Sequence, residues 1–181
     1  MSTNPRHDRD DPKGKPVVRM WTDGSACPDN PGPGGWATVL IFEDHEIELS
    51  GSTPWSSNIR MELTAVLRGL QYLDVPSFVV VYTDSQYIVD GFRNILHRNK
   101  LLKSHYDVWG LILHLSQIHQ VRISKVKAHS GVEGNERVDV MARTAARGQL
   151  GDTYMWGTER LLEHIKLEER RQKLEKKSWE W

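Results

Sequence analysis

Hydrophobic and polar positions change period several times along the 181 residues, and each period predicts an element. Three short apolar runs come first, at 17–22, 35–42 and 46–52. Their length and spacing predict three strands in an antiparallel meander. Asp23-Gly24 is a turn signal that ends the first run, and the Pro- and Gly-rich segment 27–35 is expected to be a loop.

From Asn58 the period becomes helical. Leu63, Val66, Leu67, Leu70 and Leu73 recur at the spacing of one helix face. They predict a helix over about 59–74, with Asn58 as its N-cap and Val75-Pro76 as its end. The β-branched run FVVVYT at 78–83 predicts a central, buried strand.

The rest of the pattern completes an alternating order. It predicts a helix over about 86–96, an irregular basic segment over 97–105, a helix around 108–115, a strand over 121–126 and a helix over 136–147 that stops at Gly148. Five strands and four helices in this order predict an α/β layered domain with a mixed sheet.

The polar, Pro-rich residues 1–16 predict a disordered leader, and the domain is expected to span 17–150. Residues 151–181 contain a charge-laced helical pattern whose apolar stripe fades after Leu167. We expect a largely solvated helical appendage, with docking on a protein partner as the alternative.

Composition narrows the class. At 20.8 kDa and 38% hydrophobic residues, the chain has the material for one packed domain. No apolar run is long enough to span a membrane, and the leader lacks the apolar stretch of a secretory signal. The single cysteine, Cys27, excludes disulfide frameworks and cysteine-based zinc sites. We therefore expect a cytoplasmic, monomeric protein without a membrane partner.

The net charge of zero hides an uneven layout. Residues 17–84 hold three Lys/Arg against nine Asp/Glu, whereas 85–127 hold seven Lys/Arg against two Asp. Such a domain can grip a polyanion with one segment and concentrate carboxylates in the other. A solvated helix face explains the basic segment equally well.

Two acids stand at the ends of apolar strands. Asp23 follows VVRMWT and Asp84 follows FVVVYT. If those strands are parallel neighbours, the two carboxylates meet at one sheet edge, where α/β proteins bind ligands. Glu62 is expected in the first helical turn after Asn58, and Asp139 lies in the last core helix.

Each acid also has a purely structural explanation. Asp23 could belong to a turn, and Asp84 could cap the next helix together with Ser85. Glu62 could interact with its helix dipole, and Asp139 could form an i,i+4 ion pair with Arg143. Taken together, however, converging carboxylates repel one another unless a cation joins them. Oxygen-only ligands favour Mg²⁺, and two such ions can support phosphoryl displacement.

His129 lies in the Gly-containing loop AHSGVEGN, ten residues before Asp139. A loop position suits a proton shuttle near neutral pH better than a buried structural role. The chain has no GxxxxGK[ST] pattern, so NPGPGG is not a phosphate-binding P-loop.

Four blocks of the sequence resemble the signature blocks of type 1 ribonuclease H. They are WTDGSACPDNPGPGGWATVL, SSNIRMELTAVLRGL, VVVYTDSQYIVDGF and VKAHSGVEGNERVDVMARTAA, in the family's order over about 17–147. The resemblance implies a three-layer fold around a five-stranded mixed sheet, here with a C-terminal helical extension. It also implies endonucleolytic cleavage of the RNA strand of RNA–DNA hybrids, leaving 5′-phosphate and 3′-hydroxyl ends.

By motif, the resemblance implies a catalytic set of four metal-binding acids and a loop histidine. These are Asp23, Glu62, Asp84 and Asp139, with His129 as the proton-moving or product-releasing group. The implied cofactor is Mg²⁺, two ions per site, with Mn²⁺ as a substitute. Asn30, Asn58 and Gln86 match hybrid-contacting positions, and Ser57 matches a residue that helps to hold a DNA-strand phosphate. Side-chain amides suit recognition of base edges and 2′-hydroxyls in a wide minor groove.

Three departures from the family pattern stand out. The basic protrusion after Asp84 is short: it keeps Arg93, Arg98, Lys100 and Lys103 but has no Trp before Trp109, so substrate grip is weaker or rests elsewhere. Ile59 replaces a residue that is often polar, which removes one substrate contact. The segment 151–181 matches nothing in the family.

Two other functions remain open on the sequence. The chain could be a hybrid-binding or scaffolding module without turnover, although such a module has no chemical need for four acids. It could also be a nuclease of the same architecture acting on DNA alone or on double-stranded RNA. The amide residues Asn30, Asn58 and Gln86 speak against that alternative.

Overall fold

A computed structural model describes residues 14–98, 104–128 and 131–148, with the side chains of 95–98 left out. Its strands are β1 Val17–Ala26, β2 Gly32–Ile41, β3 Glu46–Ser56, β4 Phe78–Thr83 and β5 Gln120–Lys125. Its helices are α1 Asn58–Tyr72, α2 Gln86–Arg98, α3 Tyr106–Ile118 and α4 Glu133–Gly148. The element order predicted from the sequence is confirmed.

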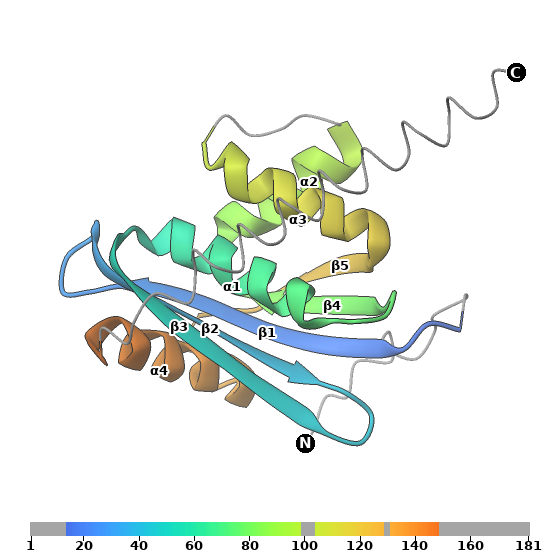
Figure 1. The fold of residues 1–181 in the computed structure, drawn as a ribbon, viewed down its shortest axis with the longest axis horizontal. Coiled ribbons are helices and arrows are strands. Elements are labelled where there is room, and N and C mark those ends of the chain that lie inside the picture. The colour runs from blue at the N-terminus through green and yellow to red at the C-terminus, as the bar shows by residue number, and fades with distance from the viewer. Residues whose placement is uncertain (1–13, 99–103, 129–130, 149–181) are drawn as a thin grey trace, which may run out of the picture.

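The five strands form one mixed sheet in the order β3-β2-β1-β4-β5. β1, β2 and β3 pair antiparallel, whereas β4 is parallel to both β1 and β5. Helices α1, α2 and α3 cover one face and α4 covers the other, which gives three layers (Figure 1). This arrangement is the fold that the sequence resemblance implies.

Apolar side chains on the two sheet faces account for the layers. On the face of α1–α3, residues such as Met20, Leu67 and Trp109 are completely buried. On the face of α4, Ala37 and Val39 pack against Val138 and Ala142. Burial of one large apolar side chain stabilises the folded state by about 1.5–3 kcal/mol, so both layers are held mainly by these contacts.

The expected end of the first strand is wrong. β1 continues through Asp23-Gly24 to Ala26, and β2 begins at Gly32, inside the segment expected to be a loop. A Cβ on Gly24 would lie 2.0 Å from the main-chain nitrogen of Glu62, and one on Gly35 would lie 2.2 Å from the carbonyl oxygen of Ala142. These glycines therefore allow helices to approach the sheet, rather than turning the chain.

The start of α1 also differs from the expectation. Ser57, not Asn58, is the N-cap, and its Oγ accepts a 3.3 Å hydrogen bond from the Arg60 nitrogen. The Asn58 side chain is taken up by another contact, since its Oδ1 accepts from the Ala26 nitrogen of β1. Glu62 consequently lies beyond the first turn of α1, so the expected placement at the helix start is corrected.

Several sequence predictions lie outside the described residues. They concern the leader up to residue 13, Lys100 and Lys103 of the basic segment, His129, and the segment 151–181. Within the described part, no helix has the length and apolar character needed to cross a membrane.

Candidate active site

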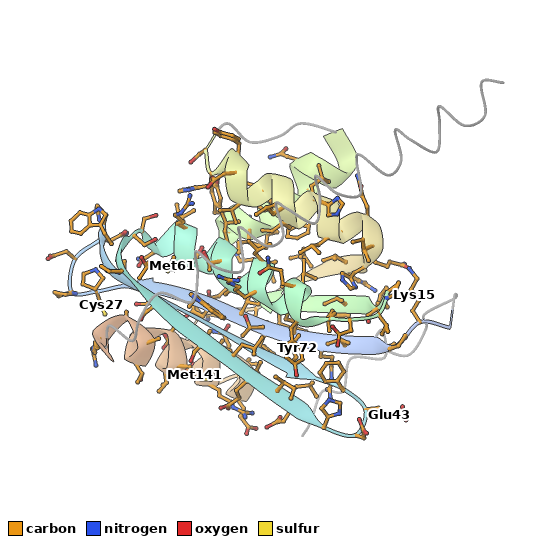
Figure 2. The ribbon with its side chains drawn as sticks, in the orientation of Figure 1. Lys15, Cys27, Glu43, Met61, Tyr72 and Met141 are labelled. Carbon is orange, nitrogen blue, oxygen red and sulfur yellow. The ribbon has the colours of Figure 1, made fainter. Side chains whose placement is uncertain are left out.

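The four acids are carried by four different elements. Asp23 lies within β1, Glu62 within α1 and Asp139 within α4, and Asp84 directly follows β4. β1 and β4 lie side by side at the centre of the sheet, which brings Asp23 and Asp84 together. Because α1 and α4 cover opposite faces of the sheet, Glu62 and Asp139 belong to different covering layers. Figure 2 labels Met61 on α1, on one side of the sheet, and Met141 on α4, on the other side.

Asp23 and Asp84 meet because β1 and β4 are parallel neighbours, as the sequence analysis required. Trp21 and Tyr82 are paired in register, and their rings stack with centroids 4.4 Å apart. Each acid lies two positions further along its chain, so both follow the same face of the sheet at its carboxyl edge. The stacked rings of Trp21 and Tyr82 therefore precede the two acids by two residues on the same sheet face.

Glu62 reaches this edge because α1 passes close to β1. Gly24 faces the Glu62 main chain at a distance that leaves no room for a Cβ. The Glu62 carboxylate accepts a hydrogen bond from the Ser85 hydroxyl. The Ser85 Oγ in turn accepts a 3.4 Å hydrogen bond from the Ile88 main-chain nitrogen at the start of α2. Ser85 thus connects the end of β4, the start of α2 and the acid on α1.

Asp139 is positioned by the packing of α4. Its neighbour Val138 contacts Ala37 of β2, which is paired in register with Asp23. The Asp139 carboxylate forms an i,i+4 ion pair with Arg143, so the structural explanation offered for this acid is realised. Arg143 also acts electrostatically on Asp23, which places this ion pair within reach of the other acids.

The electrostatics show that three of the acids share one environment. Burial raises the pKa of Asp23 to about 7; a hydrogen bond from the Gly24 main chain opposes the rise, Asp84 and Glu62 add to it, and Arg143 lowers it. The pKa of Glu62 is raised mainly by burial, against the Ser85 hydrogen bond, and further by Asp84. A bound cation would relieve the mutual repulsion among these partly buried carboxylates.

Asn135 adds a neutral oxygen to this edge. Its Nδ2 donates a 3.1 Å hydrogen bond to Oδ2 of Asp84, which links α4 to the end of β4. The residue is 3% exposed, and its Oδ1 is a buried oxygen that has no hydrogen-bond partner within the described residues. A buried carbonyl oxygen of this kind is costly unless it has a partner such as a cation or ordered water.

The donor set fits a hard divalent ion in chemistry. It consists of oxygen atoms with an excess of negative charge, as Mg²⁺ and Mn²⁺ require. Across residues 14–98, 104–128 and 131–148, however, no three His, Cys, Asp or Glu side chains are placed to hold one ion together. Three of the four carboxylates are instead engaged by neighbouring side chains: Glu62 by Ser85, Asp84 by Asn135 and Asp139 by Arg143.

Two of the predicted substrate residues lie together beside the acids. The Asn58 nitrogen donates a 3.1 Å hydrogen bond to Oδ1 of Asn30, and Oδ1 of Asn58 accepts from Ala26. Main-chain donors therefore occupy both amide oxygens, and the amide nitrogens are the groups left to donate. Ser57 adjoins this pair as the N-cap of α1.

Gln86 is the first residue of α2, on the far side of Asp84 from the asparagine pair. Its side chain is exposed and is held by Lys125 and Asp90. The structure thus brings Asp23, Glu62 and Asp84 together, links Asp139 to them through Arg143, and flanks them with amides. It does not describe His129.

Three residues of the site escaped the sequence reasoning as functional groups: Ser85, Asn135 and Arg143. Asn135 had a readable signal, because it precedes Asp139 by four residues and so shares its helix face. Ser85 and Arg143 had been considered only as structural partners. These observations together define an α/β protein with an acidic, oxygen-only site at the carboxyl edge of two parallel strands.

Comparison with known proteins gives the family. The family model described as RNase H matches residues 15–147. The ribonuclease H of Trichodesmium erythraeum is 44% identical over 140 residues, covering 72% of this chain and 88% of that protein. The ribonuclease H of Moorella thermoacetica is 43% identical over 138 residues, covering 71% of this chain and 90% of that protein.

Solved structures agree in fold. LC9-RNase H1, a type 1 RNase H with the type 2 active-site motif, superposes with a TM-score of 0.65 at 26% identity, covering 75% of this chain and 74% of that one. LC11-RNase H1 in complex with RNA/DNA hybrid gives a TM-score of 0.61 at 24% identity, covering 74% and 99%. The chain belongs to the RNase H family.

Proposed function

We propose that this ribonuclease H cleaves the RNA strand of RNA–DNA hybrids endonucleolytically, leaving 5′-phosphate and 3′-hydroxyl ends. The observation that carries the proposal is the cluster at the carboxyl edge of β1 and β4. There, Asp23 and Glu62 are partly buried, and this burial together with the nearby Asp84 raises their pKa values. A relative solved in complex with RNA/DNA hybrid supports the choice of substrate.

Asp23, Glu62, Asp84 and Asp139 would hold the divalent ions, Mg²⁺ with Mn²⁺ as a substitute, and the unpartnered Oδ1 of Asn135 lies beside Asp84 as a further oxygen. When bound, two such ions would make the attacking water more acidic and stabilise the charge on the leaving oxygen. The cation would bind at these carboxylates alongside Arg143, which contacts Oδ2 of Asp139, and Ser85, which contacts Oε2 of Glu62.

The chain's own groups then perform separate tasks. A water molecule attacks the phosphorus, and the bond to the 3′ oxygen breaks, so that the phosphate stays on the 5′ end of the downstream fragment. Arg143 lies beside Asp139, where its positive charge would stabilise the negative charge on the phosphate under attack. We place His129, in the loop before α4, as the group that moves a proton or assists product release.

Recognition of the hybrid is assigned to the amides beside the acids. Because the oxygens of Asn30 and Asn58 accept from main-chain nitrogens, their amide nitrogens donate to acceptors in the minor groove. Gln86 contacts the hybrid from the other side of Asp84, and Ser57 holds a phosphate of the DNA strand. The catalytic domain is placed at 17–150, acting as a monomer, with the segment 151–181 as a separate tail.

Three labelled duplexes of one sequence test this assignment: an RNA–DNA hybrid, a DNA duplex and an RNA duplex, each incubated with the protein and Mg²⁺. We expect internal cuts in the RNA strand of the hybrid and no comparable cutting of the other two. Equal cutting of the DNA or RNA duplex would contradict the substrate assignment. Tight hybrid binding without any cutting would instead identify a binding module.

A further inference from the structure

The end of β5 lies beside the proposed site. Lys125, the last residue of β5, is paired in register with Thr83, the last residue of β4, so it stands at the same sheet edge as Asp84. Its neighbour Ile123 packs into the core under α1–α3, and alternation along the strand puts the Lys125 side chain on that same face. This is the face on which α2 begins with Gln86.

The Lys125 side chain contacts Gln86 directly. Its Nζ donates a hydrogen bond to Oε1 of Gln86. Nε2 of Gln86 donates at 3.0 Å to Oδ1 of Asp90, and the same oxygen pairs with Nη1 of Arg93 at 3.2 Å. A cation therefore holds one end of the amide and an anion holds the other.

This arrangement gives the Gln86 amide a single orientation. If the amide rotated by 180°, its NH₂ group would face the ammonium of Lys125, and its oxygen would face the carboxylate of Asp90. Both contacts would be repulsive, because Lys has only donors and an ionised Asp only acceptors. One N–H and one oxygen lone pair of the amide remain available, which matches the combined donor and acceptor character of a 2′-hydroxyl.

Holding a long polar side chain in place before binding also reduces the cost of complex formation. An exposed Gln loses side-chain rotamer freedom when it is fixed. In this chain that loss is borne in the free protein, so the contact with the hybrid is made at lower cost.

We propose that Lys125 is a positioning residue that fixes the Gln86 amide for recognition of the RNA strand, and so sets the preference for hybrid over DNA duplex. The proposal rests on the proposed function, in which Gln86 contacts the hybrid. This role differs from a simple phosphate contact. A phosphate contact would strengthen binding of every duplex, whereas Lys125 acts through Gln86 and so strengthens binding of the hybrid alone.

The test measures the Kd of fluorescent hybrid and of DNA duplex in EDTA, so that binding is read without turnover. Lys125→Met removes the charge and keeps the apolar stem. Lys125→Arg is the conservative variant, and Arg122→Met removes an exposed cation of the same strand on the opposite sheet face. All of these side chains are exposed, so the fold is expected to persist, as checked by thermal unfolding.

We expect Lys125→Met to weaken hybrid binding about three- to tenfold relative to Arg122→Met, the effect of losing one hydrogen bond. DNA-duplex binding should change by the same small factor in both variants, and Lys125→Arg should keep the preference for hybrid. In a Gln86→Ala background, Lys125→Met should have no further effect on that preference. In turnover with Mg²⁺, KM should rise while kcat stays the same.

Two results would overturn the proposal. Equal weakening of hybrid and DNA duplex would show a general phosphate contact. A full additional loss in the Gln86→Ala background would show that Lys125 does not act through Gln86. Since both readouts are equilibrium binding, they stand even if the protein fails to cut; absence of cutting would refute the proposed function separately.

Discussion

Asp23 illustrates how a side chain acquires its chemistry from its surroundings. The sequence placed an acid after an apolar run, and motif resemblance assigned it a role, but neither could give its protonation behaviour. The pKa of about 7 arises from burial within β1 and from Asp84 and Glu62, which the fold brings from 61 and 39 residues away. Long-range proximity of this kind has no periodic signature in the sequence.

The raised pKa makes a prediction about stability. Between the ordinary Asp pKa and about 7, the folded protein binds a proton that the unfolded chain has lost, so the free energy of unfolding falls as pH rises through this window. Replacing Asp23 by Asn removes the burial cost of the charge. We expect Asp23→Asn to be more stable than the wild type in EDTA, with a gain that grows from pH 4 to pH 8 and reaches about 2–4 kcal/mol.

Urea unfolding at several pH values, with Asp74→Asn as the control, measures this gain. Asp74 is an exposed acid between α1 and β4, so its replacement should change stability little at any pH. A constant difference between Asp23→Asn and the wild type from pH 4 to pH 8 would contradict the raised pKa.

At the scale of elements, agreement between sequence and structure follows the clarity of the local signal. The strand at 78–83 was predicted with its observed bounds, because the run of aromatic and β-branched residues FVVVYT ends at the charged Asp84. The end of β1 was not, because Gly24 is equally typical of a turn and of a close approach between elements. Only the packing of α1 against β1 distinguishes the two.

Substitution of Gly24 therefore tests whether close packing of α1 against β1 positions Glu62. A Cβ at this position would meet the Glu62 main chain at 2.0 Å, and a helix backbone cannot yield locally. We expect Gly24→Ala to lower the free energy of unfolding by about 3 kcal/mol and to displace Glu62 from the site. Urea unfolding measures the stability, and hybrid cleavage measures the effect on the site.

Gly110→Ala is the matched control. Gly110 is an exposed position within α3, and a Cβ there would have nothing within 4 Å. The substitution should stabilise the protein by about 0.5–1 kcal/mol through helix propensity. If Gly24→Ala proves as stable as Gly110→Ala, the close packing of α1 on β1 is not what places Glu62.

Over the whole molecule, the uneven charge found in the sequence matches a division of tasks. The acidic part, 17–84, supplies Asp23, Glu62 and Asp84, whereas Lys125 and Arg93 belong to the basic part, 85–127. The fold class, and the meeting of Asp23 and Asp84 at one sheet edge, could be predicted from motifs and alternation. The i,i+4 pair of Asp139 and Arg143 could be predicted as well, because it lies within one helix. The contacts of Ser85 with Glu62 and of Asn135 with Asp84 could not, because they join elements that are distant in the sequence.

The tail leads to a prediction at the same scale. The family model ends at residue 147, and every site residue named here precedes it. We expect a chain truncated after residue 150 to fold and to cut hybrid at a rate within about twofold of the full chain, because the truncation keeps the whole family match and every proposed site residue. Loss of cooperative thermal unfolding on truncation would show instead that the tail belongs to the core.

The central proposal is that the four carboxylates act as one divalent-ion site, and cleavage of an end-labelled hybrid in Mg²⁺ or in EDTA tests it directly. The wild type and Asp74→Asn should cut in Mg²⁺ and not in EDTA. Asp84→Asn should remain folded and lose about a thousandfold in rate, the effect of several kcal/mol of charge stabilisation. Mg²⁺-dependent cutting by Asp84→Asn at the wild-type rate, or undiminished cutting in EDTA, would contradict the account.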